Sequence, residues 1–188
     1  MVIEKAGKFS ASKFSKLFSG KSTDSYKGVI NKVVFETISG KPIDSEDSYK
    51  SASMQRGNDL EPEARLDYEL QTFNIVDEVG LIEVNDFVCV SPDGLIGLDG
   101  GLEIKCLEYN AFIEFMITKK LKADYKWQVQ GCLWASEREW WDFHVYHPDY
   151  ESKPLRIYRD EPDIKKLEIE LAIAIETAKE RIIKLKAV

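Results

Sequence analysis

Three charged side chains in the middle of the chain could carry out metal-assisted chemistry. Asp93 stands in a Ser-Pro-Asp-Gly segment, and Glu103 and Lys105 follow it in an apolar stretch that alternates with period two. Side chains that repeat every second residue share one face of a strand, so Glu103 and Lys105 are expected side by side. Two converging carboxylates repel each other unless a proton or a cation lies between them, and Mg²⁺ prefers such oxygen ligands. With a lysine alongside, the set favours hydrolysis of a phosphodiester.

Two short strands joined by a turn would bring these residues together. Residues 87–90 and 101–107 are the apolar segments, and the Gly and Asp residues of 97–101 predict the turn between them. The second strand is apolar enough to be central, and a buried charge there requires a partner or a metal ion. Asp93 could instead be a simple turn residue before Gly94, and Glu103 with Lys105 an exposed ion pair.

Three further segments accompany this pattern. Residues 8–14 contain Ala-Ser, residues 56–65 contain Gly-x-x-x-Glu-Pro-x-Ala-Arg, and residues 127–134 contain Gln-x-Gln. In this order, together with Ser-Pro-Asp-Gly and Glu-x-Lys-Cys, they resemble the lambda exonuclease, or YqaJ-like, branch of the PD-(D/E)XK nuclease superfamily. The resemblance runs from about Lys5 to the Trp140-Trp141 segment. It implies an α/β (α+β) fold with a restriction-endonuclease-like core, in which helices flank a central mixed β-sheet.

The resemblance also implies a metal site. Asp93 and Glu103, helped by the backbone carbonyl of Ile104, would hold one Mg²⁺, and Asp93 with Glu61 a second, with Mn²⁺ able to substitute. Lys105 would position or deprotonate the attacking water, or neutralise developing charge, and the sequence does not separate these roles.

Two glutamines compete for a place beside this site. Gln128 and Gln130 are two residues apart on an expected helix, so they cannot face the same way. The resemblance favours Gln128, which would orient the water or Lys105, and leaves Gln130 as the second choice.

The resemblance predicts a 5′-to-3′ exonuclease that resects linear double-stranded DNA in phage-type recombination, works as a ring-shaped trimer and has a single-strand annealing protein as partner. Ser12 and Lys5 would bind the 5′ phosphate, although the family has arginine where this chain has Lys5, which lacks the bidentate fork. An endonuclease of the restriction or branched-DNA type on the same scaffold is the alternative. A non-catalytic DNA-binding module is a third possibility.

The charge distribution bears on DNA binding. The net charge is −7, but residues 1–32 contain seven lysines against two acidic residues, and residues 33–104 contain sixteen acidic and four basic residues. A second basic cluster comprises the lysines at positions 119, 120, 122 and 126. Phosphate contacts require local positive charge rather than a positive total. Ordinary solvated helix surface is the alternative explanation for both clusters.

Length and composition limit the remaining possibilities. A chain of 188 residues suggests one domain spanning residues 1–188. No apolar run is long enough for a membrane span, and no signal-peptide core is expected. Cys89, Cys106 and Cys132 predict reduced core thiols in a cytoplasmic protein, and they argue against a four-cysteine iron–sulfur cluster. His144 and His147 are expected on opposite strand faces, which makes them a poor metal pair.

Periodicity and capping signals place the other elements. Helices are expected over residues 10–20 (capped by Ser10), 26–39, 53–71, 111–119, 124–135 (capped by Asp124) and 160–185. Pro62 should mark either the start of the third helix or a kink in it. Strands are expected within residues 73–84 and over 139–146 and 155–158, and an exposed loop over 41–50.

Overall fold

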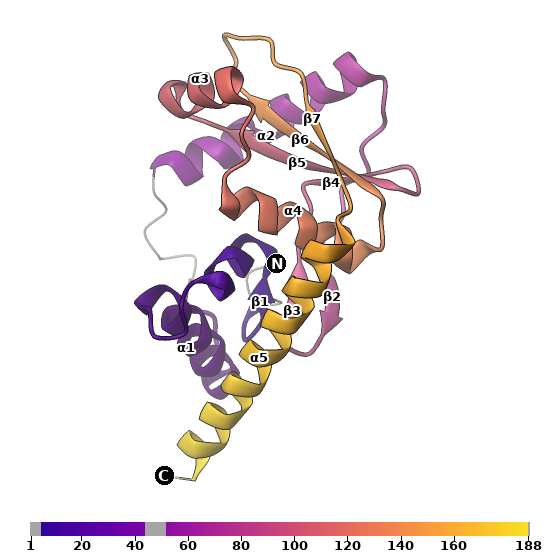
Figure 1. The fold of residues 1–188 in the computed structure, drawn as a ribbon. Coiled ribbons are helices and arrows are strands. Elements are labelled where there is room, and N and C mark those ends of the chain that lie inside the picture. Colours follow the sequence, from indigo (N-terminus) through magenta and orange to yellow (C-terminus); the bar gives the residue numbers. More distant parts are fainter. Residues whose placement is uncertain (1–4, 44–51, 188) are drawn as a thin grey trace.

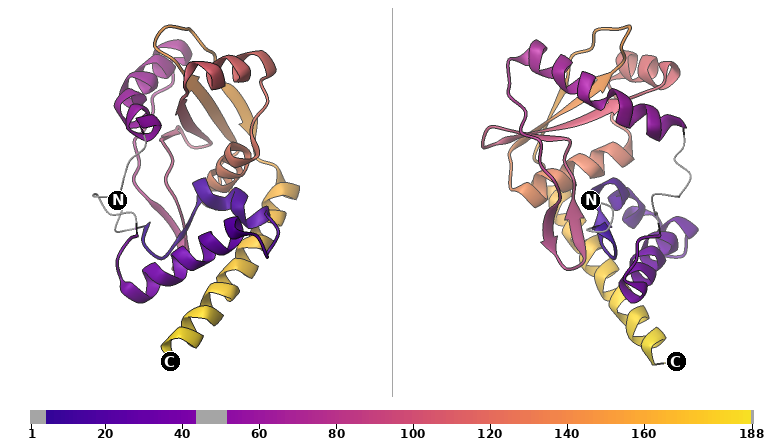
Figure 2. Two further views of the ribbon diagram at one scale, coloured as in Figure 1. Left: turned by 90° about the vertical axis from the view of Figure 1, so that its left-hand side faces the viewer. Right: turned by 180° about the vertical axis from the view of Figure 1, so that it is seen from behind.

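The computed structural model describes residues 5–43 and 52–187, which form two small sheets with helices packed around them (Figures 1 and 2). The expected loop over 41–50 therefore lies mostly outside the described residues. The first sheet has the order β1-β3-β2, and the second has the order β4-β5-β6-β7. The strands are β1 (Phe9–Ser10), β2 (Ile82–Asn85), β3 (Val88–Val90), β4 (Gly94–Ile96), β5 (Gly100–Cys106), β6 (Trp140–Tyr146) and β7 (Leu155–Tyr158).

The second sheet is mixed, as expected. Strand β5 is antiparallel to β4 and parallel to β6, and β6 is antiparallel to β7. The expected single central sheet is divided in two, because the chain leaves the first sheet after Val90 and enters the second at Gly94. Pro92 lies in this gap, and proline cannot donate a ladder hydrogen bond. The break places Asp93 between the two sheets.

The two faces of the second sheet pack against different helices. Leu102 and Ile104 of β5 belong to a small core with Ala64 and Tyr68 of α2 (Ala52–Thr72). The larger core lies on the other face and combines residues of β6 with residues of the remaining helices. Those helices are the 3₁₀ helix η2 (Ala11–Phe18), α1 (Asp24–Ser39), α3 (Tyr109–Thr118), α4 (Ala123–Ser136) and α5 (Glu161–Lys186). Figure 2 shows the sheet between α2 on one side and α3 with α4 on the other.

The contact between α2 and β6 is unusually polar. Each of three side chains of β6 hydrogen-bonds a side chain of α2. The pairs are Tyr68 Oη to Asp142 at 2.6 Å, His144 Nε2 to Asp67 at 3.0 Å, and Tyr146 Oη to Glu63 at 2.5 Å. The three side chains of β6 are buried, whereas Glu63 is exposed. Buried polar groups are stable where they are paired.

The helix ends differ in part from the sequence predictions. The segment after Ser10 forms a 3₁₀ helix, and Ser10 occupies its N-cap position as predicted, but the Ser10 side chain makes no capping hydrogen bond. Helix α1 ends at Gly40 as predicted, where φ of 65° suits glycine. Helix α2 covers the predicted range 53–71 and continues past Pro62, which excludes the alternative that the helix starts at Pro62. Asp124 is not the cap of α4, because Lys122 occupies that position.

The long C-terminal helix follows the prediction closely. Asp160 caps α5 by accepting a hydrogen bond of 3.0 Å from the Asp163 N–H. Its buried stripe comprises Ile164, Leu167, Leu171, Ala174, Ala178 and Ile182. Figure 1 shows α5 running from α4 past α1 toward the C-terminal end of the chain. Among the helices of the described residues, none is both long and apolar enough to span a membrane.

Candidate functional site

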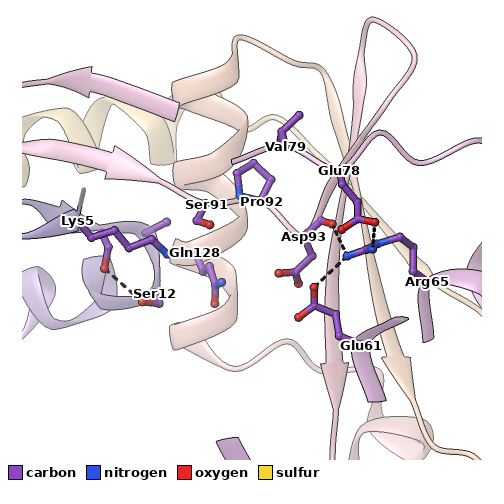
Figure 3. Close-up of a pocket in the computed structure, with 12 residues that line it drawn as sticks. Lys5, Ser12, Glu61, Arg65, Glu78, Val79, Ser91, Pro92, Asp93 and Gln128 are labelled. Atoms are coloured by element: carbon purple, nitrogen blue, oxygen red, sulfur yellow. Dashed lines mark hydrogen bonds and ion pairs between the residues drawn. The ribbon is translucent and has the colours of Figure 1, made fainter. Parts of the chain in front are cut away.

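A cavity of about 350 Å³ gathers residues from five separate parts of the chain. They come from the N-terminal segment with η2, from α2, from the stretch before β2, from the stretch before β4, and from α4; they are Lys5, Ser10, Ala11, Ser12, Glu61, Arg65, Glu78, Val79, Ser91, Pro92, Asp93 and Gln128. Figure 3 shows Asp93 and Glu61 on one side and Lys5, Ser12 and Gln128 on the other. The volume lies in the range typical of small-ligand sites.

Asp93 is held against the edge of β5. Its carboxylate accepts a hydrogen bond of 2.7 Å from the backbone N–H of Ile104. Burial raises the pKa of Asp93, although the charge of Lys105 and the Ile104 hydrogen bond act in the opposite direction. The turn residue of the sequence pattern is therefore a partly buried carboxylate that is fixed by the neighbouring strand.

Glu103 lies at the centre of the polar contacts. Its side chain is 1% exposed, and one carboxylate oxygen accepts a hydrogen bond of 2.6 Å from Gln128 and pairs with the Lys105 ammonium. The other oxygen is buried without a hydrogen-bond partner among the described residues. Burial, followed by the charge of Asp93, raises the pKa of Glu103 to about 8. This rules out the exposed ion pair that the sequence left open.

Lys105 faces this group of carboxylates. Burial alone would lower its pKa, but the charges of Glu103 and Asp93 outweigh burial and raise it. The Tyr125 ring of α4 lies under the ammonium, 5.7 Å from its nitrogen to the ring centroid. The lysine is therefore a stable positive charge between two acids.

Glu61 reaches the cavity from α2 and is held by Arg65, one helical turn later. Arg65 donates to Glu61 Oε1 at 3.0 Å and to the Asp93 carbonyl at 3.4 Å, and it pairs with Glu78 at 2.6 Å. Burial and then the charge of Asp93 raise the pKa of Glu61. Arg65 was not among the predicted site residues, although its spacing of four from Glu61 was a usable signal. Glu78 carries no comparable signal.

The donor set suits a hard divalent cation. Three carboxylates have raised pKa values, and one buried carboxylate oxygen has no hydrogen-bond partner among the described residues. A bound cation would stabilise the ionised form of these carboxylates. Across residues 5–43 and 52–187, no group of three or more acidic, histidine or cysteine side chains is arranged closely enough to hold an ion. The ligand set of Glu61, Asp93, Glu103 and the Ile104 carbonyl therefore stays a prediction.

Helix α4 turns its two glutamines in different directions. Gln128 faces Glu103, whereas Gln130 donates to the Tyr158 carbonyl at 2.9 Å and accepts from the Asp160 N–H at 3.0 Å. Gln130 thus fastens α4 to the segment between β7 and α5. Of the two candidates, only Gln128 lines the cavity.

Residues 4–139 match the family model of the YqaJ-like viral recombinase domain. No curated protein matches the chain. Two solved structures of the alkaline exonuclease LHK-Exo, one described as from Laribacter hongkongensis and one as in complex with dAMP, are similar to it with a TM-score of 0.90 and 31% identity. The alignment covers 99% of this chain and 95% of theirs. A phage-related exonuclease from Haemophilus somnus 129PT shares the fold, with a TM-score of 0.73, 19% identity and coverage of 95% and 96%.

The order of the sequence motifs, the carboxylates beside Lys105 at the edge of a mixed sheet, and these matches agree. The chain belongs to the YqaJ-like viral recombinase domain family, within the lambda-exonuclease branch of the PD-(D/E)XK nucleases.

Proposed function

We propose that this protein is a Mg²⁺-dependent deoxyribonuclease that resects linear double-stranded DNA from its 5′ ends in phage-type recombination. One observation carries the proposal: Lys105 and Gln128 converge on the buried Glu103, and Asp93, whose charge acts on Glu103, lines the cavity. The similarity to LHK-Exo, whose description names it an alkaline exonuclease, supports this choice.

The acidic residues of the site would bind the metal ions. Asp93, Glu103, Glu61 and the Ile104 carbonyl would hold two Mg²⁺ ions, with Mn²⁺ able to substitute. The ions would supply positive charge at the scissile phosphate and at the attacking and leaving oxygens. Asp93 keeps its orientation through the Ile104 N–H.

The positive charge of Lys105 adds to that of the ions. Because its ammonium is stabilised by two acids, we assign it to the stabilisation of developing phosphate charge rather than to proton abstraction. Gln128, which donates to Glu103, fixes the carboxylate and would orient the water.

The far wall of the cavity supports recognition of the 5′ end. Lys5 and Ser12 line the same cavity as Asp93, so a terminal phosphate bound there would lie close to the site of hydrolysis. Lysine provides a point charge for this contact, and the Ser12 hydroxyl provides a donor. We expect removal of the 5′ phosphate from the substrate to slow digestion.

An endonuclease on the same scaffold is the second candidate, because the catalytic residues alone do not distinguish the two. The experiment is a time course in Mg²⁺ on linear duplexes labelled at either end, with and without 5′ phosphate, beside covalently closed circular DNA. The proposal expects early release of the 5′ label and intact circles. Cleavage of the circles would favour the endonuclease.

The assembly and the partner remain further proposals. Several large apolar side chains near the end of α2 are exposed, including Leu70, Phe73 and Ile75, which are 67%, 92% and 79% exposed. Exposed apolar patches of this kind are typical of contact surfaces. They support a homo-oligomer, for which we propose a trimeric ring, and analytical ultracentrifugation tests it. A single-strand annealing protein is the proposed partner.

The proposed cytoplasmic location draws on the cysteines. All three are free thiols in the structure, and reduced thiols are typical of a reducing compartment. Fractionation of the cells that produce the protein tests this location.

A further inference from the structure

The two lysine-rich stretches of the sequence meet on one surface. Residues 5–18 contain four lysines and no acidic residue, and residues 115–128 contain four lysines and one acidic residue, Asp124. Asp124 lies between the two stretches: it accepts a hydrogen bond of 2.5 Å from Ser15 and pairs with Lys16 at 3.4 Å. Helix η2 and the start of α4 are therefore direct neighbours.

The two elements also pack rigidly against each other. The ring of Phe18 stacks on Trp127 with 3.7 Å between the ring centroids. Phe14 lies against Gly131 so closely that a Cβ atom at position 131 would be 2.5 Å from its ring. Lys13 on η2 and Lys122 at the N-cap of α4 are thus carried by one packed unit, and Lys120 lies two residues before Lys122 in the connection from α3.

This basic surface begins at the cavity and leads away from it. Ser12 lines the cavity and Lys13 is the next residue, while Gln128 lines the cavity and Lys122 precedes it as the N-cap of α4. Six residues of helix correspond to about 9 Å along the axis. One DNA strand places a phosphate about every 3.4 Å of helix axis, so Lys122 stands roughly two to three phosphates from the cavity.

Three of these lysines are available to a ligand. Lys13, Lys120 and Lys122 are exposed, and within the described part of the chain none of them forms an ion pair. Lys16 and Lys126 pair with Asp124 and Asp163 instead. The peptide dipoles at the start of α4 add partial positive charge, of which Asp124 in the first turn offsets a part.

We infer that Lys13, Lys120 and Lys122 form a binding surface for the sugar-phosphate backbone of duplex DNA next to the strand end that enters the cavity. The inference rests on the proposed nuclease function and specifies the path of its substrate. Charge complementarity selects this ligand: the protein as a whole carries −7, yet the surface that adjoins the cavity is basic. An acidic protein segment would meet the same charges, and the test separates the two.

The test measures binding of a 5′-phosphorylated linear duplex in chelator, by fluorescence anisotropy over a range of NaCl concentrations. The variant is Lys120→Gln with Lys122→Gln. Its matched control is Lys184→Gln with Lys186→Gln, two exposed lysines at the far end of α5 (Figure 1). Each phosphate contact contributes about one unit to the salt slope of log K, so the variant should lose about two units. A fourfold rise in salt should then weaken the wild type about 16-fold more than the variant.

A second variant, Lys13→Gln on η2, should lose about one unit of slope, and melting temperatures verify that each variant folds. In Mg²⁺ the variants should need more DNA for half-maximal digestion and reach the wild-type rate at saturation. Variants that bind DNA with the affinity and salt slope of the control overturn the inference, even if they lose binding to an acidic peptide. Failure of the wild type to digest DNA would refute the proposed function instead, and the binding data would still decide the inference.

Discussion

Metal-free protein should lose stability as the pH rises, and Glu103 is the main cause. The pKa of this carboxyl is about 8 in the folded protein, compared with 4.5 for an unperturbed glutamate. Between these values the folded chain retains a proton that the unfolded chain has released. The contribution of Glu103 to the free energy of unfolding is therefore greatest below about pH 4.5. It decreases as the pH rises from there to about 8.

The size of the effect follows from the shift in pKa. Each pH unit inside this window lowers the free energy of unfolding by at most about 1.4 kcal/mol, so the whole window accounts for at most about 5 kcal/mol. That is a large part of the roughly 5–15 kcal/mol by which most domains are stable. A divalent ion should restore stability at pH 8, by about 2.7 kcal/mol at a concentration 100-fold above its dissociation constant.

Urea unfolding in chelator at several pH values between 5 and 8.5 measures this, with Glu103→Gln as the variant that cannot titrate. Glu176→Gln, at an exposed glutamate of α5, is the matched control. As the pH rises, the free energy of unfolding of the wild type should fall more steeply than that of Glu103→Gln. Mg²⁺ at pH 8 should stabilise the wild type more than the variant. Parallel stability curves for the two proteins would refute this account of the buried carboxyl.

Four other substitutions test contacts in the site, in the cores and on α2. Lys105→Ala should slow digestion of linear duplex by about 100-fold or more while circular dichroism shows an intact fold, and a wild-type rate would exclude the residue from the chemistry. Gly101→Ala would place a Cβ atom 2.2 Å from the Trp141 ring and should cost about 1–3 kcal/mol in urea unfolding. Gly57→Ala, with nothing within 4 Å, should instead stabilise by up to about 1 kcal/mol, and equal effects at the two glycines would contradict the packing argument. Asp142→Ala removes the acceptor of a buried tyrosine hydroxyl and of a bidentate arginine, and should cost about 2–4 kcal/mol; a loss below about 0.5 kcal/mol would show that the network contributes little.

The strand that carries Glu103 and Lys105 could be predicted because its pattern is local. Period-two alternation needs no knowledge of the rest of the fold, and β5 lies within one residue of the expected segment at each end. The helix stop at Gly40 was predictable for the same reason. Each of these signals depends only on backbone geometry over a few neighbouring residues.

Features that depend on tertiary partners were not predictable from spacing. Asp124 has the residue type and position of a helix cap, but Ser15, which is distant in the sequence, takes its carboxylate. Glu63 is exposed on the helix, yet its carboxylate accepts a hydrogen bond from Tyr146, which is distant in the sequence. Pro62 is tolerated within α2 because packing against the sheet can override an unfavourable local propensity.

In the candidate site too, some residues could be predicted from local sequence and others depend on the folded chain. Residue types and order were sufficient to select Asp93, Glu103 and Lys105, whereas the choice of Gln128 over Gln130 came from resemblance alone. The structure supplies the physical reason: Gln130 is committed to the backbone at the end of β7 and the start of α5. Only the folded chain places those backbone groups within reach.

The polar contact between α2 and β6 has a consequence for the position of Glu61 along the sheet. A purely apolar interface would allow a helix to shift along a strand at a small cost in free energy. The three hydrogen-bonded pairs between α2 and β6 can form together in only one register. A slip by one helical turn, about 5.4 Å, would separate every pair at once. The three pairs therefore fix the register of α2 on the sheet, and this register determines the position of the Glu61 carboxylate relative to Asp93.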